Sequence, residues 1–214
     1  GGVGAPLLLL EGLAQLRDLA LPMDGLSFRM LSSAAEPVVT GHADGVITLD
    51  LAEADDALAH DLSHLRMVKD EWEVEQMQAA VDATRTGFEA VIGELPSLPG
   101  RGRGERWVEG TFGLIARHEG NGVGYDSICA SGDHANTLHW IKNTGDVKEG
   151  DLLLLDAGVE VDSLYTADIT RTLPISGTFS PAQRRVYRAV LEAQDAAAAV
   201  AKVGHDHAEI HQAA

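Results

Sequence analysis

The segment from Leu152 to Pro174 constrains the fold more than any other part of the chain, and it reads LLLLDAGVEVDSLYTADITRTLP. Two apolar stretches flank a polar tip at Val161–Ser163, a pattern that predicts an antiparallel β-hairpin. The four consecutive leucines are typical of a strand that is covered on both faces. If the hairpin is centred on Asp162, then Asp156 lies directly opposite Asp168. The Cβ atoms of directly opposed residues are roughly 4.5–5.5 Å apart.

Two carboxylates at this distance repel each other, and burial beside leucines makes their ionisation still less favourable. A shared proton relieves the repulsion, and so do one or two divalent cations bound between the oxygens. The spacing leaves a second arrangement open, because a tip one residue longer or shorter sends the two side chains to opposite faces. One aspartate then simply caps a turn. Asp162, at the tip, is assigned to turn chemistry rather than to a ligand.

Three helices are predicted around this hairpin. The first starts with acidic residues after Asp70, and its apolar residues recur every three or four positions: Met77, Val81, Phe88, Val91, Ile92 and Leu95. The second runs from about Glu105 to His118. The third begins at Ser180 with a capping-box sequence, and its expected buried stripe comprises Val186, Val190, Ala193, Ala197 and Val200. Short extended pieces are expected at Ser127–Ala130 and Thr137–Ile141.

The residues before Arg66 do not form a convincing core of their own. A helical pattern at Pro6–Leu21 ends at Pro22, and Leu51–Leu65 is acidic, rich in alanine and also helical. Short strands are expected between them, at Ser27–Ser32, Val38–Thr40 and Val46–Leu49. We therefore predict that residues 1–65 are the remnant of an N-terminal domain or a linker, and that residues 66–214 form the second domain.

The composition excludes several classes of partner. Sixteen basic and 33 acidic residues give a formal net charge of −17, which repels phosphate backbones and argues against nucleic-acid binding. The apolar runs are shorter than the roughly 18–20 residues that cross a bilayer, so no membrane association is expected. A single cysteine, Cys129, leaves no internal disulfide and is typical of a reducing compartment, so a cytoplasmic location is expected.

Five stretches resemble the pita-bread metallopeptidases, specifically the aminopeptidase P (Xaa-Pro aminopeptidase) branch. They occur in the family's order from about Arg66 to the C-terminus: Val68–Gln78, Val108–Phe112, Val123–Trp140, Gly150–Glu160 and Tyr165–Tyr187. The resemblance implies an α+β fold in which helices cover an antiparallel sheet. It also implies a metal-dependent aminopeptidase that hydrolyses the bond between an N-terminal residue and a following proline.

The resemblance implies a role for four residues. Asp156 and Asp168 match the aspartates that bind two divalent ions, and a hydroxide between those ions attacks the peptide carbonyl. Manganese is the family's usual metal, which agrees with hard oxygen ligands; zinc and cobalt are alternatives. His139 matches a catalytic histidine, on the strand before the hairpin, that positions substrate and stabilises the tetrahedral intermediate. Tyr125 matches a tyrosine that borders the metal centre and bonds a ligand carboxylate.

The family's site has three further ligands, one histidine and two glutamates, from the second half of the fold. The resemblance therefore implies that this chain is a partial copy containing only the first half, which leaves a sheet face and a helix stripe uncovered. Family members generally form dimers or larger oligomers and act on peptides with proline at the second position. An Xaa-Pro dipeptidase, or a catalytically inactive pita-bread peptide-binding module, is the alternative.

Overall fold

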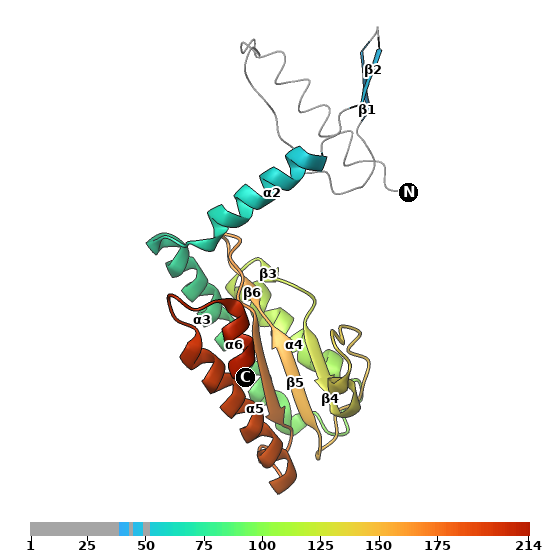
Figure 1. The fold of residues 1–214 in the computed structure, drawn as a ribbon. Helices are drawn as coiled ribbons and strands as arrows, with labels where there is room; N and C mark the ends of the chain where they lie inside the picture. Colours follow the sequence, from blue (N-terminus) through green and yellow to red (C-terminus); the bar gives the residue numbers. More distant parts are fainter. Residues whose placement is uncertain (1–38, 43–44, 49–51) are drawn as a thin grey trace. The chain divides into compact units, whose positions relative to one another are not determined.

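The computed structural model describes residues 39–42, 45–48 and 52–214. The chain divides into two compact units, Gly1–Val68 and Lys69–Ala214, and each is described by itself (Figure 1). The helix predicted at Pro6–Leu21 and the strand predicted at Ser27–Ser32 lie outside the described residues. The interpretation of residues 1–65 as a domain remnant or linker stays a prediction.

The described residues of the first unit form a small hairpin and one helix. Strands β1 (Val39–His42) and β2 (Gly45–Thr48) pair antiparallel, with Val39 opposite Thr48. Helix α2 (Ala52–Met67) follows. The two short strands and the helix expected in this region are thus present, with bounds shifted by one or two residues.

Two helices form one layer of the second unit. Helix α3 (Glu71–Glu94) begins with a capping box in which the Asp70 carboxylate accepts from the Glu73 amide, and the Glu73 carboxylate accepts from the Asp70 amide. These bonds satisfy two backbone donors that the first turn of a helix leaves free. A single 3-10 turn, η1 (Leu95–Ser97), leads toward helix α4 (Gly104–Glu119). Both predicted helices are therefore present.

The other layer is an antiparallel sheet in the order β4-β5-β7, formed by Ile128–Ser131, Leu152–Ala157 and Ile169–Pro174. A second, two-stranded ladder joins β3 (Gly122–Val123) to β6 (Val159–Glu160), directly after β5 in the chain. β5 is the central strand and β7 follows it through the hairpin, so the predicted antiparallel hairpin is confirmed (Figure 1).

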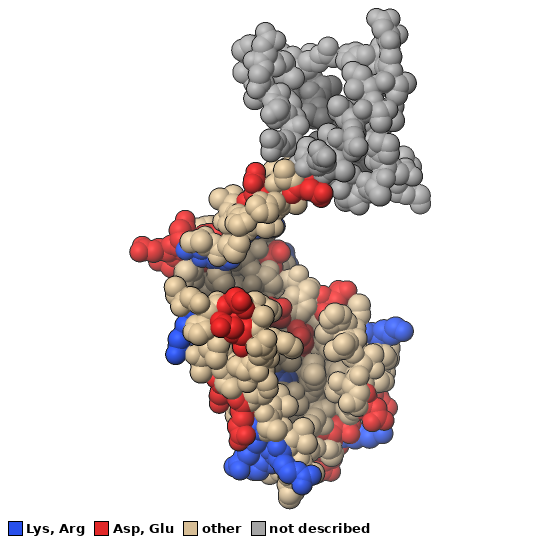
Figure 2. All heavy atoms as spheres, viewed as in Figure 1, with Lys and Arg blue, Asp and Glu red and all other residues tan. Residues whose placement is uncertain are grey.

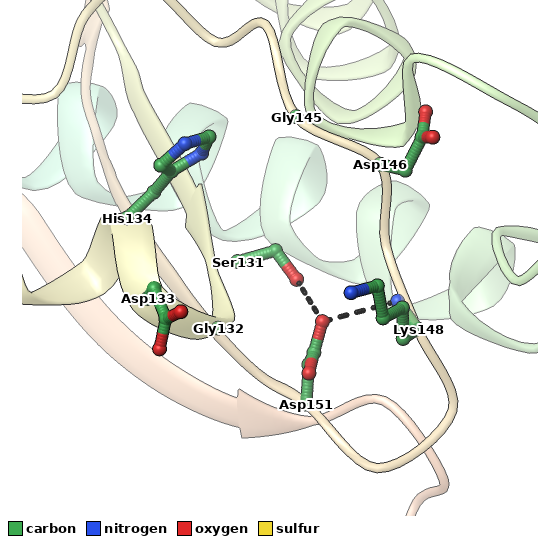
Figure 3. A pocket seen from close by; sticks show the side chains of 8 residues that line it. All are labelled: Ser131, Gly132, Asp133, His134, Gly145, Asp146, Lys148 and Asp151. Atoms are coloured by element: carbon green, nitrogen blue, oxygen red, sulfur yellow. Dashed lines mark hydrogen bonds between the residues drawn. The ribbon is translucent and has the colours of Figure 1, made fainter.

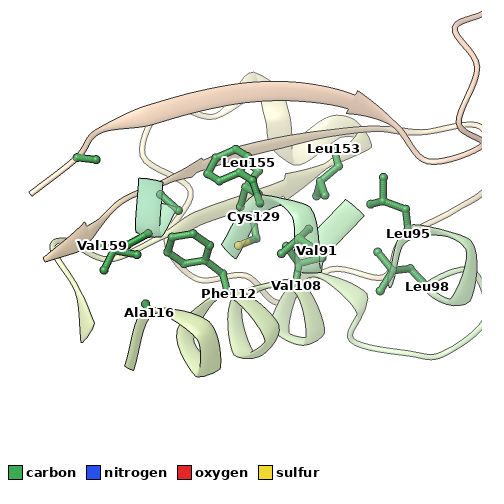
Figure 4. Close-up of a cluster of buried hydrophobic side chains, with 14 of the residues drawn as sticks. Val91, Leu95, Leu98, Val108, Phe112, Ala116, Cys129, Leu153, Leu155 and Val159 are labelled. Atoms are coloured by element: carbon green, nitrogen blue, oxygen red, sulfur yellow. The ribbon is translucent and has the colours of Figure 1, made fainter. Parts of the chain in front are cut away.

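The core lies between the helices and one face of the sheet (Figure 4). Leu153, Leu155 and Ala157 of β5 are completely buried, whereas the residues between them are only half-buried. Phe112 of α4 is also completely buried, and its ring meets that of Phe88 edge to face, with centroids 5.9 Å apart. The alternation along β5 shows that one face is covered. The expectation of a strand covered on both faces is therefore wrong for the described residues.

The last two helices are α5 (Pro181–Val200) and α6 (His207–Ala213). The capping box predicted at Ser180 is confirmed, because its hydroxyl and the Gln183 side chain bond each other's backbone amides. The predicted burial of the α5 stripe is not found, since Val186 is 62% exposed and Val190 is 64% exposed. The other three residues of the stripe, Ala193, Ala197 and Val200, are half-buried.

Charges on the visible face are mixed rather than segregated (Figure 2). Acidic atoms are scattered over the second unit, and basic atoms gather near the start of α5, whose first turns contain three arginines. The formal net charge of −17 is therefore not concentrated in one acidic region of this face. In the described residues, no helix combines the length and the apolar character that a bilayer crossing requires.

The tip of the hairpin is attached to the start of α3. The Tyr165 hydroxyl donates to Glu73 Oε1 at 2.5 Å, and the Tyr165 ring meets the ring of Trp72 edge to face, with centroids 5.9 Å apart. The bond to Glu73 is the main reason that the pKa of Tyr165 rises to about 12. Farther along α3, the Val159 amide donates to the buried hydroxyl of Thr84 at 2.9 Å. These contacts fix the position of the hairpin on the helix layer.

Candidate functional site

The register of the hairpin differs from the predicted one. Asp156 lies opposite Thr170, not opposite Asp168, and the pairs of β5 and β7 are centred on Ser163. The turn is closed by the Leu164 amide, which donates to the Val161 carbonyl at 2.8 Å, and Leu164 adopts a left-handed conformation with φ 69°. The predicted centre at Asp162 is therefore wrong by one residue.

With the centre shifted by one residue, the two aspartates still lie on the same face of the sheet. Moving the centre by one residue changes each cross-strand partner by two, and side chains alternate with a period of two. Asp168 is therefore the diagonal neighbour of Asp156. The Tyr125 hydroxyl oxygen lies 2.7 Å from Asp156 Oδ1 and 3.0 Å from Asp168 Oδ1. Because both distances are short, the two carboxylate oxygens converge on the Tyr125 hydroxyl. The hydroxyl has one proton, so it donates to one of the two oxygens at a time.

Tyr125 reaches this point because the sheet changes register beside it. It lies between β3 and β4, and the preceding amide of Gly124 bonds the carbonyl of Gly158 at 2.9 Å. Gly158 has no Cβ, and an added Cβ would lie 1.5 Å from the Ala167 carbonyl oxygen and 3.2 Å from Tyr125 Cε1. The close approach of the strands at Gly158 therefore brings Tyr125 beside both aspartates.

The surroundings of the pair are anionic. Asp156 Oδ2 accepts a further bond from the Thr170 hydroxyl at 2.7 Å. Burial, the bonds to the two aspartates and their charges raise the pKa of Tyr125, so its hydroxyl stays protonated and donates. In the described part of the chain, no Lys, Arg or His lies within ion-pair distance of either carboxylate. The negative charges are thus not neutralised by a side chain there.

This arrangement fits divalent metal ions. Two carboxylate oxygens that converge without a cationic partner are hard ligands of the kind that Mn²⁺ and Mg²⁺ prefer. Asp156 is half-buried and Asp168 is exposed, so ions reach both from the open face of the sheet. Within residues 52–214, no third His, Cys, Asp or Glu joins the pair to complete a metal site. The described residues thus contribute two ligands.

His139 does not lie on a strand. The expected strand at Thr137–Ile141 is absent, because a short 3-10 helix, η2 (Gly132–Asn136), and an irregular segment occupy the chain after β4. His139 has φ 53°, a left-handed conformation that interrupts strand pairing. Its imidazole is exposed and makes no hydrogen bond within the described part of the chain. The structure therefore brings Tyr125, Asp156 and Asp168 together and leaves His139 outside that contact.

Sequence reasoning missed Glu105. This side chain is completely buried at the start of α4 and accepts four hydrogen bonds. Oε1 accepts from the Ser131 amide and pairs with His134 Nδ1, both at 2.8 Å; Oε2 accepts from the Trp140 indole at 3.0 Å and from the Gly145 amide at 2.6 Å. An acidic residue in the first turn of a helix is common, so its sequence position does not distinguish it.

Glu105 is ionised in the folded protein, and its replacement by glutamine should change the acid stability. Burial opposes the charge, yet the bonds from Ser131, Trp140, Gly145 and His134 lower the pKa of Glu105 below its ordinary value of 4.5. Because the folded-state pKa is the lower one, this carboxylate stabilises the fold above about pH 4.5 and loses that effect as the pH falls further. Urea unfolding of Glu105→Gln should therefore show a weaker loss of stability between pH 4.5 and 3 than the wild type; an equal slope would contradict this account.

Comparisons with known proteins assign the chain to a family. Residues 75–214 match the model of metallopeptidase family M24. A second model, described as "Putative zinc-binding metallo-peptidase", matches residues 8–68, less than half of the chain, and gives no assignment. Xaa-Pro aminopeptidase 2 of Streptomyces coelicolor is 55% identical over 171 residues, which cover 80% of this chain and 36% of that protein. Xaa-Pro aminopeptidase 1 of the same organism is 54% identical over 162 residues, covering 76% and 33%.

Solved structures show the same fold. The aminopeptidase PepP of Pseudomonas aeruginosa superimposes with a TM-score of 0.65 at 36% sequence identity, covering 74% of this chain and 34% of that chain. The X-Pro aminopeptidase of Thermotoga maritima gives a TM-score of 0.66 at 27% identity, covering 78% and 49%. The chain thus spans about a third of the length of the Streptomyces relatives. The predicted pita-bread fold is confirmed, with this chain covering part of its length in the solved structures, and the chain belongs to metallopeptidase family M24.

Proposed function

We propose that the protein containing this chain is a metal-dependent aminopeptidase that hydrolyses the bond between an N-terminal residue and a following proline. The observation that supports this most directly is the convergence of Asp156 and Asp168 on the Tyr125 hydroxyl without a cationic side chain. The names of the Streptomyces relatives support the choice of Xaa-Pro peptides. The complete activity also needs ligands beyond this pair, and the family supplies them from one histidine and two glutamates.

In this proposal, Asp156 and Asp168 hold two divalent ions, with Mn²⁺ as the native metal and Zn²⁺ or Co²⁺ as alternatives. Such ions lower the pKa of bound water and polarise a carbonyl group. Tyr125 donates to one carboxylate and so fixes the direction of its second oxygen. His139, whose imidazole makes no hydrogen bond to residues 52–214, positions the substrate and stabilises charge that develops on the peptide carbonyl oxygen.

The partners proposed are peptides with proline at the second position and further copies of the chain. The homo-oligomer is proposed from the resemblance, because members of the family generally form dimers or larger oligomers. The formal net charge of −17 disfavours nucleic acid as a partner. A cytoplasmic location rests on the single cysteine, Cys129, which is completely buried.

A peptide panel tests the proposal. The purified protein, first stripped with a chelator and then supplied with Mn²⁺, Zn²⁺ or Co²⁺, is incubated with Xaa-Pro-Xaa tripeptides, with Xaa-Pro dipeptides and with tripeptides that have alanine in place of proline. Release of the first residue from the proline tripeptides alone, and only with metal, supports the proposal. Cleavage restricted to dipeptides would identify a dipeptidase. Binding of the peptides without cleavage under every condition would identify a peptide-binding module.

Removing the Tyr125 hydroxyl should weaken the metal centre without unfolding the protein. Tyr125→Phe keeps the ring but removes the donor to both aspartates. Changes of this kind next to metal ligands cost roughly 10- to 100-fold in metal affinity or activity. Tyr187→Phe is the matched control, because the Tyr187 ring contacts Phe179 while its hydroxyl makes no hydrogen bond in the described part of the chain. Metal titration of both variants checks the prediction, and equal affinities would contradict it.

A further inference from the structure

Two completely buried side chains, Glu105 and Asn143, connect the irregular segment from Gly132 to Gly145 to the rest of the second unit, and Glu105 makes the larger number of these bonds. Glu105 binds the amide of Ser131 just before the segment and the amide of Gly145 at its end. Between these points the same carboxylate binds the ring of His134 and the indole of Trp140. Four donors that are spread over fifteen positions therefore share the two oxygens of Glu105.

His139 lies in the part of this segment that has the fewest other contacts. Leu138 is 90% exposed and Ile141 is 46% exposed, so apolar burial does not fix the backbone around His139. The neighbouring Trp140 is the nearest anchored residue in the chain: its indole stacks on His134 with ring centroids 3.9 Å apart, and both rings bind Glu105. The position of His139 therefore depends on Trp140.

The backbone here is held in an unfavourable conformation. His139 and Asn143 have φ values of 53° and 46°. For residues other than glycine this left-handed region is unfavourable, and it persists where the surroundings determine it. Asn143 is held by its own bonds to Cys129 and Ser127. Among the residues that the structure describes, the one backbone bond of His139 is that of its carbonyl with the Ile141 amide, at 2.8 Å, and the adjacent Trp140 is the contact that determines its conformation.

A surface pocket lies where the two ends of the segment meet. This pocket of about 350 Å³ lies beside the two ends, and both His134 and Gly145 line it (Figure 3). Asp151, which also lines it, accepts from the Ser131 hydroxyl and from the Lys148 amide through Oδ2, both at 3.1 Å. The two ends approach each other at Glu105, because a Cβ added to Gly145 would lie 2.8 Å from both the Glu105 carboxyl carbon and His134 Nδ1.

We propose that Glu105, through Trp140, is the positioning residue for His139. The buried carboxylate orders the segment from residue 132 to residue 145 and thereby sets where the exposed imidazole lies. This inference rests on the proposed function, in which His139 acts on the substrate. A charged carboxylate is required, because the two amides and the indole only donate, and a side-chain amide in place of the carboxylate would direct its own N–H groups at some of them.

Trp140→Phe tests the inference with the least disturbance, because it removes one donor to Glu105 and keeps an aromatic ring against His134. Trp107→Phe is the matched control. The Trp107 indole also donates to a glutamate, Glu94 Oε2 at 2.8 Å, but Trp107 lies on α4, outside the segment. Amide hydrogen exchange, followed by mass spectrometry, should become faster for residues 132–145 in Trp140→Phe and remain unchanged there in Trp107→Phe. Unchanged exchange in both variants would overturn the proposal.

Kinetics separate positioning from general stability. Misplacement of a catalytic group by about 1 Å costs on the order of 100-fold, so Trp140→Phe should lower kcat/KM about 10- to 100-fold while bound metal stays unchanged. In a His139→Ala background the same change should have almost no further effect, because the group that it displaces is gone. An equal loss in both backgrounds would overturn the proposal.

Two further results are informative. Glu105→Gln should show the same exchange pattern as Trp140→Phe and a larger loss of kcat/KM; a folded Glu105→Gln protein with wild-type exchange would overturn the inference. Hydrogen exchange does not depend on turnover. The wild-type protein could fail to cleave Xaa-Pro peptides while the Trp140→Phe variant still exchanges faster in the segment. That combination would remove the proposed function and support the ordering role of Glu105.

Discussion

Asp156→Asn in the purified protein should abolish metal binding and peptide hydrolysis together. Asp156 lies on the central strand, where its two oxygens are next to Tyr125 and Thr170, and asparagine retains the shape of the side chain but not its charge. Metal ions contribute several kcal/mol of transition-state stabilisation, and each 1.36 kcal/mol corresponds to a tenfold change in rate. We therefore expect kcat/KM to fall on the order of 1,000-fold. Elemental analysis of bound metal and peptide hydrolysis measure the two effects.

Asp162→Asn is the matched control for this experiment. It makes the same chemical change in the same hairpin, at the exposed tip, where the described part of the chain gives the side chain no ion pair. Its metal content and activity should equal those of the wild type. If Asp156→Asn binds metal and cleaves peptides to the same extent as Asp162→Asn, the assignment of Asp156 as a ligand is wrong.

Gly158→Ala should have the largest effect on stability. The new Cβ would lie 1.5 Å from the Ala167 carbonyl oxygen and 2.6 Å from its carbon, far inside van der Waals contact. Both atoms belong to the backbone, so no rotation of a side chain relieves the clash, and the two strands must separate. Overpacking usually costs about 1–3 kcal/mol and sometimes more, and we expect at least about 3 kcal/mol here. Urea unfolding measures this loss.

The control for this substitution is Gly113→Ala on α4. A Cβ at Gly113 meets no heavy atom within 4 Å, and alanine is favoured over glycine within a helix by roughly 0.5–1 kcal/mol. Gly113→Ala should therefore leave stability unchanged or slightly increased. Because the strands separate beside Tyr125, Gly158→Ala should also weaken metal binding. A stability equal to that of Gly113→Ala would show that the hairpin accommodates the methyl group without strain.

The sequence predicted the parts of this fold that depend on local patterns. The capping box of Ser180 was evident because its two partners are three residues apart. The shared face of Asp156 and Asp168 was correct even though the register was not, since the alternation of a strand depends only on whether the shift is even. The left-handed conformation of Leu164 moved the centre of the turn by one residue. That conformation is rare for leucine, so the local sequence did not predict it.

The parts that depend on long-range contacts could not be predicted. The bonds from Glu105 reach residues between 26 and 40 positions away, and they replace the strand that was expected around His139. On α3, the apolar period identified two faces but not which one the sheet covers: Val91 is completely buried, whereas Met77 and Ile92 are 41% and 47% exposed. Only the packing partner decides between such faces, and it lies elsewhere in the chain.

The contact between Trp72 and the hairpin tip gives the protein a built-in optical reporter. Trp72 meets Tyr165 edge to face and lies one position before Glu73, which holds the Tyr165 hydroxyl. The other two tryptophans, Trp107 and Trp140, bond glutamates on or beside α4 and lie away from this tip contact. With both of these replaced by phenylalanine, the emission of the remaining indole would follow, in real time and without any dye, whether the aspartate-bearing hairpin stays docked on its helix.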